Sequence, residues 1–214
     1  YFSVKNLAKI CFENNLQLIH ISTDYVFDGK KNEPYIESDL PNPINKYGLS
    51  KFSGENSILD YNLTGSVIIR TSWVYSESSN NFVRKIIDKI NLGNSFSVVD
   101  NEFGSPTNAS DLAKAILDII PHLKDESTQI YHFSNSGVCS RYDLAVEINR
   151  LLDGKSVISS SKSLNTITRR PKFSALDSNK IANKFQLDIN DWKYSLENFF
   201  KELDKNKMSF YESY

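Results

Sequence analysis

Short apolar runs containing β-branched residues alternate along this chain with longer segments of helical periodicity. We expect strands at four places: Leu16 to Ile21, Ser66 to Thr71, Phe96 to Val99 and Gln129 to Phe133. We expect helices in the residues up to Asn14 and then at Lys46 to Tyr61, Asn80 to Leu92, Ser110 to Ile120, Arg141 to Leu152 and Ile189 to Leu203. Strands separated by helices of about a dozen residues form parallel βαβ units. The pattern therefore predicts an α/β fold in which helices cover both faces of an open parallel sheet.

The charge balance limits the partners of the chain. Twenty-five Lys and Arg residues against 26 Asp and Glu residues give a formal net charge of -1, which provides no positive field for nucleic acid or anionic lipid. The apolar runs are far shorter than the ~20 residues that span a bilayer. Lys5 and Lys9 also interrupt the segment where a secretory signal would be apolar. We therefore expect a cytoplasmic protein that binds neither nucleic acid nor a membrane.

The residue types that ligate metals are few and scattered. Cys11 and Cys139 lie far apart and form no C-x-x-C motif, which favours two reduced thiols over a disulfide or a thiolate metal site. His20, His122 and His132 also lack the spacing of metal ligands. The sequence therefore predicts no metal site.

A hydroxyl, a phenol and an amine stand where the ligand crevice of such a sheet is expected, beyond the carboxyl ends of the strands. Thr23 follows the first expected strand, and Tyr47 and Lys51 lie four residues apart on one face of the next helix. A nearby ammonium stabilises phenolate and lowers the pKa of a tyrosine from about 10. The set could polarise a carbonyl and protonate its oxygen as hydride arrives. The same spacing arises by chance, as in Tyr1 and Lys5, so a turn, a helix start and a solvated lysine remain the alternative.

Longer stretches of the sequence resemble a known family. They are Ile21-Ser22-Thr23-Asp24-Tyr25-Val26-Phe27-Asp28-Gly29, Pro43-Ile44-Asn45-Lys46-Tyr47-Gly48-Leu49-Ser50-Lys51, Gly54-Glu55, Arg70-Thr71-Ser72-Trp73-Val74-Tyr75, residues 96–107 and Arg170-Pro171-Lys172-Phe173-Ser174-Ala175-Leu176-Asp177. In this order they resemble the extended short-chain dehydrogenase/reductases and, among these, the dTDP-4-dehydrorhamnose reductase family. The resemblance covers essentially the whole chain.

The resemblance implies reduction of a 4-keto nucleotide sugar by NADPH or NADH. In this family the product is dTDP-L-rhamnose, made from dTDP-4-dehydro-L-rhamnose for polysaccharide biosynthesis. By resemblance, Tyr47 would donate the proton to the C4 oxygen, and Thr23 would hydrogen-bond the carbonyl. Lys51 would lower the pKa of Tyr47 and, with Tyr47, hold the nicotinamide ribose. The sugar site would be lined by Thr23, Asp24, Tyr25 and Trp73, although Trp73 in the core and Asp24 as a turn cap are alternatives.

The resemblance also divides the chain. Residues 1–75 would be the C-terminal part of an NAD(P)-binding Rossmann domain with the catalytic residues. Residues 76–214 would form mainly a smaller C-terminal substrate-binding α/β region, with the chain crossing back to the Rossmann part.

One part of the family pattern is missing. A dinucleotide site needs a glycine-rich turn at a helix N-terminus, but no two of the eight glycines lie two or three positions apart. We expect that the chain lacks roughly the first 80 residues of the pattern, which would leave it inactive by itself. The residues that choose between NADPH and NADH would be missing with them. Some family members use Mg²⁺ or form homodimers, and the sequence identifies neither property.

Two other interpretations remain open. The regulatory subunit of methionine adenosyltransferase resembles this family and shares much of the same motif pattern, so a non-catalytic binding role is an alternative. Another nucleotide-sugar reductase or epimerase is the second alternative. Sugar-dependent oxidation of the cofactor and substrate profiling would separate the three.

Overall fold

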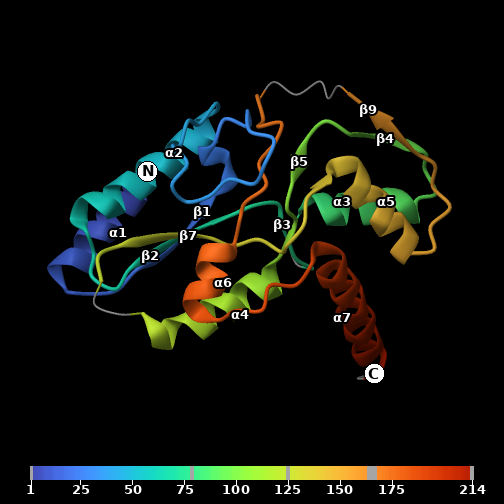
Figure 1. The fold of residues 1–214 in the computed structure, drawn as a ribbon. Helices are drawn as coiled ribbons and strands as arrows, with labels where there is room; N and C mark the ends of the chain where they lie inside the picture. Colours follow the sequence, from blue (N-terminus) through green and yellow to red (C-terminus); the bar gives the residue numbers. More distant parts are fainter. Residues whose placement is uncertain (1, 78–79, 124–125, 163–167, 213–214) are drawn as a thin grey trace.

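A three-stranded parallel sheet lies at the centre of one end of the molecule (Figure 1). The computed structural model describes residues 2–77, 80–123, 126–162 and 168–212, with side chains up to Leu203 in the last helix. The sheet has the order β1-β2-β7, formed by β1 (Ile19–Thr23), β2 (Val67–Thr71) and β7 (Gln129–His132). All five residues of the middle strand β2 are buried, because helices cover both faces of the sheet.

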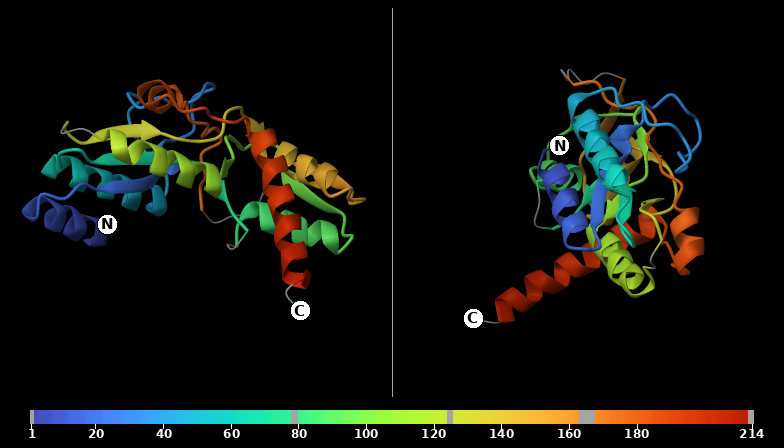
Figure 2. Two further views of the ribbon diagram at one scale, coloured as in Figure 1. Left: turned by 90° about the horizontal axis from the view of Figure 1, so that it is seen from below. Right: turned by 90° about the vertical axis from the view of Figure 1, so that its left-hand side faces the viewer.

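The helices lie on both faces, as predicted (Figures 1 and 2). On one face α1 (Phe2–Glu13) and α2 (Lys46–Tyr61) pack around Ile68 of β2. On the other face α4 (Ala109–Ile119) and α6 (Asn179–Phe185) pack around its neighbours Val67 and Ile69. Successive side chains of β2 thus enter opposite cores, as the two-residue period of a strand requires. We call the sheet and these four helices the sheet lobe.

The remaining long elements form a second lobe at the other end of the molecule (Figure 2). It contains α3 (Phe82–Asn91), α5 (Arg141–Leu151), α7 (Trp192–Glu212) and the parallel strands β4 (Phe96–Val99) and β9 (Ile158–Ser161). Four apolar residues of α3 recur with helical spacing and are buried in the core of this lobe: Val83, Ile86, Ile87 and Ile90.

Short elements connect the two lobes. Two ladders pair β3 (Val74–Tyr75) with β6 (Thr107–Asn108), and β5 (Phe103–Gly104) with β8 (Cys139–Ser140). Two 3₁₀ helices complete the described elements, η1 (Asp24–Val26) after β1 and η2 (Ile120–His122) after α4. The ladders bring segments far apart in the sequence together between the lobes.

The first strand differs from its predicted bounds. Leu16 belongs to the end of α1, because its backbone N–H donates to the Cys11 carbonyl at 2.8 Å and Asn15 adopts a left-handed φ of 53°. The strand begins at Ile19 and extends two residues further than expected, so that Thr23 is its last residue. The hydroxyl of Thr23 is therefore held by the sheet instead of a loop.

The other predicted elements are confirmed with smaller shifts, except at the C-terminal helix. The bounds of α2 and β4 agree with the prediction, whereas α7 begins at Trp192 instead of Ile189 and continues to Glu212. The prediction missed α6, which has seven residues, and β9, which contains three serines. Even the 21-residue α7 is too polar to cross a membrane, and none of the other helices in the described ranges has the length and apolar character to do so.

Candidate functional site

The structure brings the three predicted catalytic residues to the carboxyl end of β1. Thr23 ends this strand, and Tyr47 and Lys51 lie in the first two turns of α2. The Lys51 ammonium donates a hydrogen bond to the Ile21 carbonyl at 2.5 Å. Tyr25, two residues after Thr23, packs its ring edge-on against Tyr47 with centroids 5.8 Å apart. The end of the strand and the start of the helix thus form one site.

A glycine allows this close approach. Asn45 caps α2 by accepting a hydrogen bond from the Gly48 N–H at 2.8 Å, which fixes where the helix starts. A Cβ atom on Gly48 would lie only 2.0 Å from the Tyr25 carbonyl oxygen. Any larger residue at this position would push η1 away from the helix start, and with it the Tyr25–Tyr47 contact.

Asp24 is a buried carboxyl group beside Thr23. The Thr23 hydroxyl donates to Asp24 Oδ1 at 3.0 Å and accepts a hydrogen bond from the Tyr25 N–H at 3.2 Å. Burial raises the pKa of Asp24 to about 6, although the Thr23 hydroxyl and the charge of Arg141 act in the opposite direction. Asp24 belongs to no metal cluster, since the described ranges contain no group of three His, Cys, Asp or Glu side chains placed to hold an ion. Asp24 is only 3% exposed, and its Oδ2 has no hydrogen-bond partner among the described residues.

Tyr47 and Lys51 fit the ribose side of a nicotinamide cofactor. The Tyr47 side chain is 55% exposed, so a ligand can reach it. An ammonium group has three donors, and the Ile21 carbonyl occupies one of those of Lys51. Half-burial lowers the pKa of Lys51, while the negative charge of Glu55 raises it. The remaining donors of Lys51 suit ribose hydroxyls, but the sequence contains no glycine-rich turn for the pyrophosphate.

Trp73 follows β2 at the boundary between the lobes. Its backbone adopts a left-handed φ of 48°, which costs a non-glycine residue about 1 kcal/mol or more. The guanidinium of Arg141 stacks on the Trp73 ring, with Cζ 3.5 Å from a ring centroid. On Gly104 a Cβ atom would lie 2.5 Å from this ring, so the ring lies directly on the backbone of β5. Trp73 is therefore half-buried and held in one position, which agrees with a place in the wall of a site.

A positively charged pocket adjoins Trp73, and we call it the cationic pocket. It has a volume of about 160 Å³, and its charged lining residues are Lys85, Lys89, Glu102, Arg141 and Arg170. Within it, Arg170 Nη1 lies 3.9 Å from Glu102 Oε2. The charge of Arg141 also acts on the nearby Asp24 and Tyr25. The cationic pocket therefore continues the site formed by the end of β1.

Sequence reasoning gave no role to the residues of the cationic pocket. Glu102 and Arg170 lie in stretches that carry the family resemblance, which was the available signal. Arg141 appeared only as the start of a predicted helix. It reaches the site because β8, which directly precedes it, pairs with β5 across 35 to 37 residues of sequence, and no local pattern reveals such a pairing.

Comparisons with known proteins identify the family of the chain. Residues 2–205 match the RmlD substrate binding domain family. A dTDP-4-dehydrorhamnose reductase of Aggregatibacter actinomycetemcomitans is 34% identical over 206 residues, 91% of this chain and 70% of that protein. A dTDP-4-keto-6-deoxy-D-glucose reductase of Streptomyces niveus is 38% identical over 148 residues, 69% of this chain and 50% of that protein.

The structural likeness has the same extent. The crystal structure of dTDP-4-dehydrorhamnose reductase from Bacillus anthracis in complex with NADP has a TM-score of 0.85 and 34% identity, over 94% of this chain and 70% of that one. This likeness confirms the predicted Rossmann-like α/β fold. The chain spans half of the length of the Streptomyces relative and 70% of the other two proteins. Its match over residues 2–205 shows that the chain belongs to the RmlD substrate binding domain family.

Proposed function

We propose that this chain carries the catalytic and substrate-binding residues of an NAD(P)H-dependent reductase that converts dTDP-4-dehydro-L-rhamnose into dTDP-L-rhamnose. The convergence of Thr23, Tyr47 and Lys51 at the carboxyl end of β1 carries the proposal. Family membership supports the broader class, the nucleotide-sugar 4-keto reductases. The relatives differ in the sugar that their names give, so the choice of dTDP-4-dehydrorhamnose is the finer part of the proposal.

Each of the three residues has a chemical role in the proposal. Reduction of a ketone adds hydride to the carbon and a proton to the oxygen, and bound NADPH or NADH would supply the hydride. The phenol of Tyr47 donates the proton, and the charge of Lys51 stabilises the phenolate that remains. Thr23 donates a hydrogen bond to the C4 oxygen after its hydroxyl proton turns away from Asp24 Oδ1.

The cationic pocket suits the diphosphate group of a nucleotide-sugar substrate. A nucleoside diphosphate carries two charged phosphate groups, and arginine recognises such oxygens with paired N–H donors. Arg141 and Arg170 supply these donors, with Lys85 and Lys89 adding charge. The sugar would lie between this pocket and Tyr47, against the side chains of Asp24, Tyr25 and Trp73.

The proposal assigns the parts of the substrate to parts of the chain. Residues 1–75 would contribute the catalytic residues and the contacts to the nicotinamide ribose, and residues 76–214 mainly the contacts to the nucleotide sugar. The chain crosses back to the sheet lobe in α4, β7 and α6, which supports the description of residues 76–214 as only mainly substrate-binding.

The decisive variant is Tyr47→Phe, which removes the proton donor and little else. Loss of a general acid reduces turnover by about 10²- to 10⁴-fold, and we expect that reduction in the sugar-dependent oxidation of NADPH. Tyr194→Phe is the matched control, because Tyr194 is a similarly exposed tyrosine on α7. Undiminished turnover by Tyr47→Phe would contradict the proposal.

A cofactor-binding experiment tests whether the chain can bind NADPH or NADH without a glycine-rich turn for the pyrophosphate. In a fluorescence titration with NADPH and NADH, saturable binding would support the proposal for the chain of 214 residues. Absence of binding would restrict the proposal to a longer protein that contains a pyrophosphate-binding turn. Binding without sugar-dependent oxidation of the cofactor would favour a non-catalytic role.

A further inference from the structure

A buried ion pair lies directly beneath the candidate site. The side chains of Glu55 on α2 and Arg70 on β2 are 0% and 2% exposed. Arg70 donates to Glu55 through Nη2 at 2.7 Å and through Nε at 3.0 Å, so both carboxylate oxygens are engaged. Removing two charges from water is costly, and an apolar pair of similar volume would often serve stability equally well. The pair therefore requires an explanation other than stability.

The position of Glu55 along α2 suggests why the buried pair is present. Tyr47, Lys51 and Glu55 are spaced by four residues and lie on one face of the helix. The hydroxyl of Ser22, which directly precedes Thr23, donates a hydrogen bond to Glu55 Oε1. The Glu55 carboxylate thus joins α2 to β1 and to β2, one helical turn from Lys51 and beside the residue that precedes Thr23.

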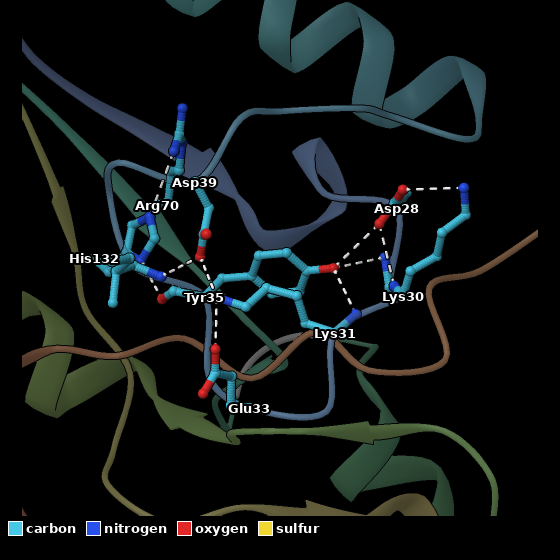
Figure 3. A network of polar contacts seen from close by, with 10 residues as sticks. Asp28, Lys30, Lys31, Glu33, Tyr35, Asp39, Arg70 and His132 are labelled. Carbon is cyan, nitrogen blue, oxygen red and sulfur yellow. Dashed lines mark hydrogen bonds and ion pairs between the residues drawn. The ribbon is translucent and has the colours of Figure 1, made fainter.

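On its other side the pair contacts the long loop before α2. Arg70 Nη1 lies 3.4 Å from His132 Nε2, and His132 Nδ1 lies 2.9 Å from the Tyr35 carbonyl oxygen (Figure 3). This arrangement assigns the proton to Nδ1 and leaves Nε2 to accept from Arg70. The Tyr35 hydroxyl donates to Asp28 Oδ1 at 3.2 Å at the far end of the same side chain (Figure 3). All three nitrogens of Arg70 therefore have a partner, and its side chain is too deeply buried for a ligand to reach it.

We propose that Glu55, held by Arg70 and Ser22, is a positioning residue that fixes Tyr47 and Lys51 of α2 relative to Thr23 of β1. The Glu55 side chain is completely buried, so it acts through these neighbours. The inference rests on the proposed function for the catalytic roles of the three residues. The contacts of Glu55 with Ser22 and Arg70 do not depend on it.

The charge of Glu55 acts on the pKa of Lys51, and this pKa is a measurement that a purely structural role would not change. Half-burial lowers the pKa of Lys51 and the carboxylate of Glu55 raises it. His20 of β1 also interacts with Lys51. Burial and the charge of Lys51 lower the pKa of His20 to about 4, so that it is neutral near pH 7. Glu55 is thus the charge that favours the ammonium form of Lys51.

The test measures the pKa of Lys51 in the full chain. Lysines are labelled by reductive methylation with ¹³C-formaldehyde and titrated by NMR, and the Lys51 signal is identified by its absence in Lys51→Arg. Glu55→Gln keeps the shape of the side chain but removes its charge, so we expect a lower pKa for Lys51. Asp118→Asn is the matched control, because Asp118 pairs with Lys114 on the distant α4 and should lower only the pKa of Lys114.

Kinetics with separate, unlabelled protein complete the test. We expect kcat of Glu55→Gln to fall by about 10- to 100-fold, while KM changes less than about twofold. In the dependence of kcat on pH, the decline at high pH should move to lower pH. Glu55→Asp, which keeps the charge with a shorter reach, should recover part of kcat. The double variant Glu55→Gln/Arg70→Met leaves no unpaired buried charge, and it provides a folded protein if the single variant unfolds.

The outcomes distinguish the two proposals. An unchanged Lys51 pKa in a folded Glu55→Gln or double variant would overturn the positioning role. An unchanged kcat with an unchanged pH profile in an active protein would do the same. If the parent protein binds the cofactor but shows no sugar-dependent turnover, that result would contradict the proposed function. A lowered Lys51 pKa in its Glu55→Gln variant would still support the coupling of Glu55 to Lys51.

Discussion

Arg70 in the sheet lobe and Arg141 in the second lobe both lie next to the candidate site, but they use their donors differently. Arg70 is fully buried, and its nitrogens are bonded to Glu55 and His132. Arg141 is half-buried and stacked on the rings of Trp73 and Phe82, and its Nε has no hydrogen-bond partner among the described residues.

This difference distinguishes an arginine that stabilises the structure from one that suits ligand binding. An arginine that is buried and has a partner inside the protein at each of its three nitrogens can hold elements together, but a ligand cannot reach it. An arginine held in place by aromatic rings keeps its donors for an anion, and the stacking limits the conformational entropy that binding would cost. The sheet lobe therefore uses its arginine to link α2, β2 and β7, whereas the second lobe holds an arginine whose Nε has no partner among the described residues.

The largest effect should come from breaking the buried pair. Arg70→Ala leaves the Glu55 carboxylate buried without a counter-charge, and we expect a loss of about 3–5 kcal/mol in the free energy of unfolding. Urea denaturation measures this loss. Arg84→Ala on α3 is the control, because Arg84 forms an exposed pair with Asp88, and such pairs contribute less than about 1 kcal/mol. Equal losses in the two variants would remove the basis of the comparison.

A substitution at the start of α2 tests how tightly the sheet-lobe side is packed. Gly48→Ala places a Cβ atom 2.0 Å from the Tyr25 carbonyl oxygen, and overpacking of this kind costs about 1–3 kcal/mol. Turnover should fall with stability, because the start of α2 carries Tyr47. Gly54→Ala in the same helix is the control: its Cβ would meet Val4 at an ordinary 3.4 Å, and alanine favours the helix by about 0.5–1 kcal/mol. Thermal unfolding of both variants should shift in opposite directions.

The sheet-lobe side was the more predictable part of the molecule. Thr23, Tyr47 and Lys51 could be placed from the sequence because each stands at a strand end or on a helix face, and both are local patterns. The Glu55–Arg70 pair could not, since a charged residue in a helix or strand normally indicates a solvated face. Only the packing of α2 on β2 shows that both charges are buried.

In the second lobe, the positions of Arg141 and β9 depend on contacts between segments that are far apart in the sequence. Arg141 reaches Trp73 through the β5–β8 ladder, whose strands have only two residues each and give no periodic signal. The strand β9 was missed because its serines lack β propensity, although it pairs with the correctly predicted β4. Elements that depend on a partner far away in the sequence are thus the ones that sequence patterns do not reveal.

Arg141→Ala should sharpen the contrast by affecting binding more than stability. A hydrogen bond to a charged group contributes about 1.5–3 kcal/mol, so KM for the nucleotide sugar should rise by about 10- to 100-fold. The loss of the stack on Trp73 should reduce stability by only about 1 kcal/mol. Steady-state kinetics and urea denaturation of the same sample measure both quantities. Arg150→Ala, which removes an exposed arginine of the same helix α5, should leave KM unchanged. A large stability loss without a change in KM would assign Arg141 a structural role.

The last effects concern the dependence of the free energy of unfolding on pH, where Asp24 and His132 act in opposite directions. Burial raises the pKa of Asp24 to about 6, so the folded state binds a proton there that the unfolded chain binds only near its ordinary value of 3.8. Asp24 therefore favours the folded state increasingly as the pH falls from about 6 to about 4. Burial, together with the charge of Arg70, lowers the pKa of His132 to about 3, below its ordinary 6.5, so the unfolded chain binds the proton first. His132 therefore disfavours the folded state as the pH falls through the same range.

Replacing each group should reveal its sign. Asp24→Asn removes the contribution that opposes acid unfolding, and the free energy of unfolding should then fall more steeply between about pH 6 and pH 4, by up to about 1.4 kcal/mol per pH unit. His132→Gln should make the same slope shallower, because its amide does not titrate but can still donate to the Tyr35 carbonyl. Urea denaturation at several pH values in this range measures both slopes. Slopes that both become shallower would contradict the raised pKa of Asp24, and slopes that both become steeper would contradict the lowered pKa of His132.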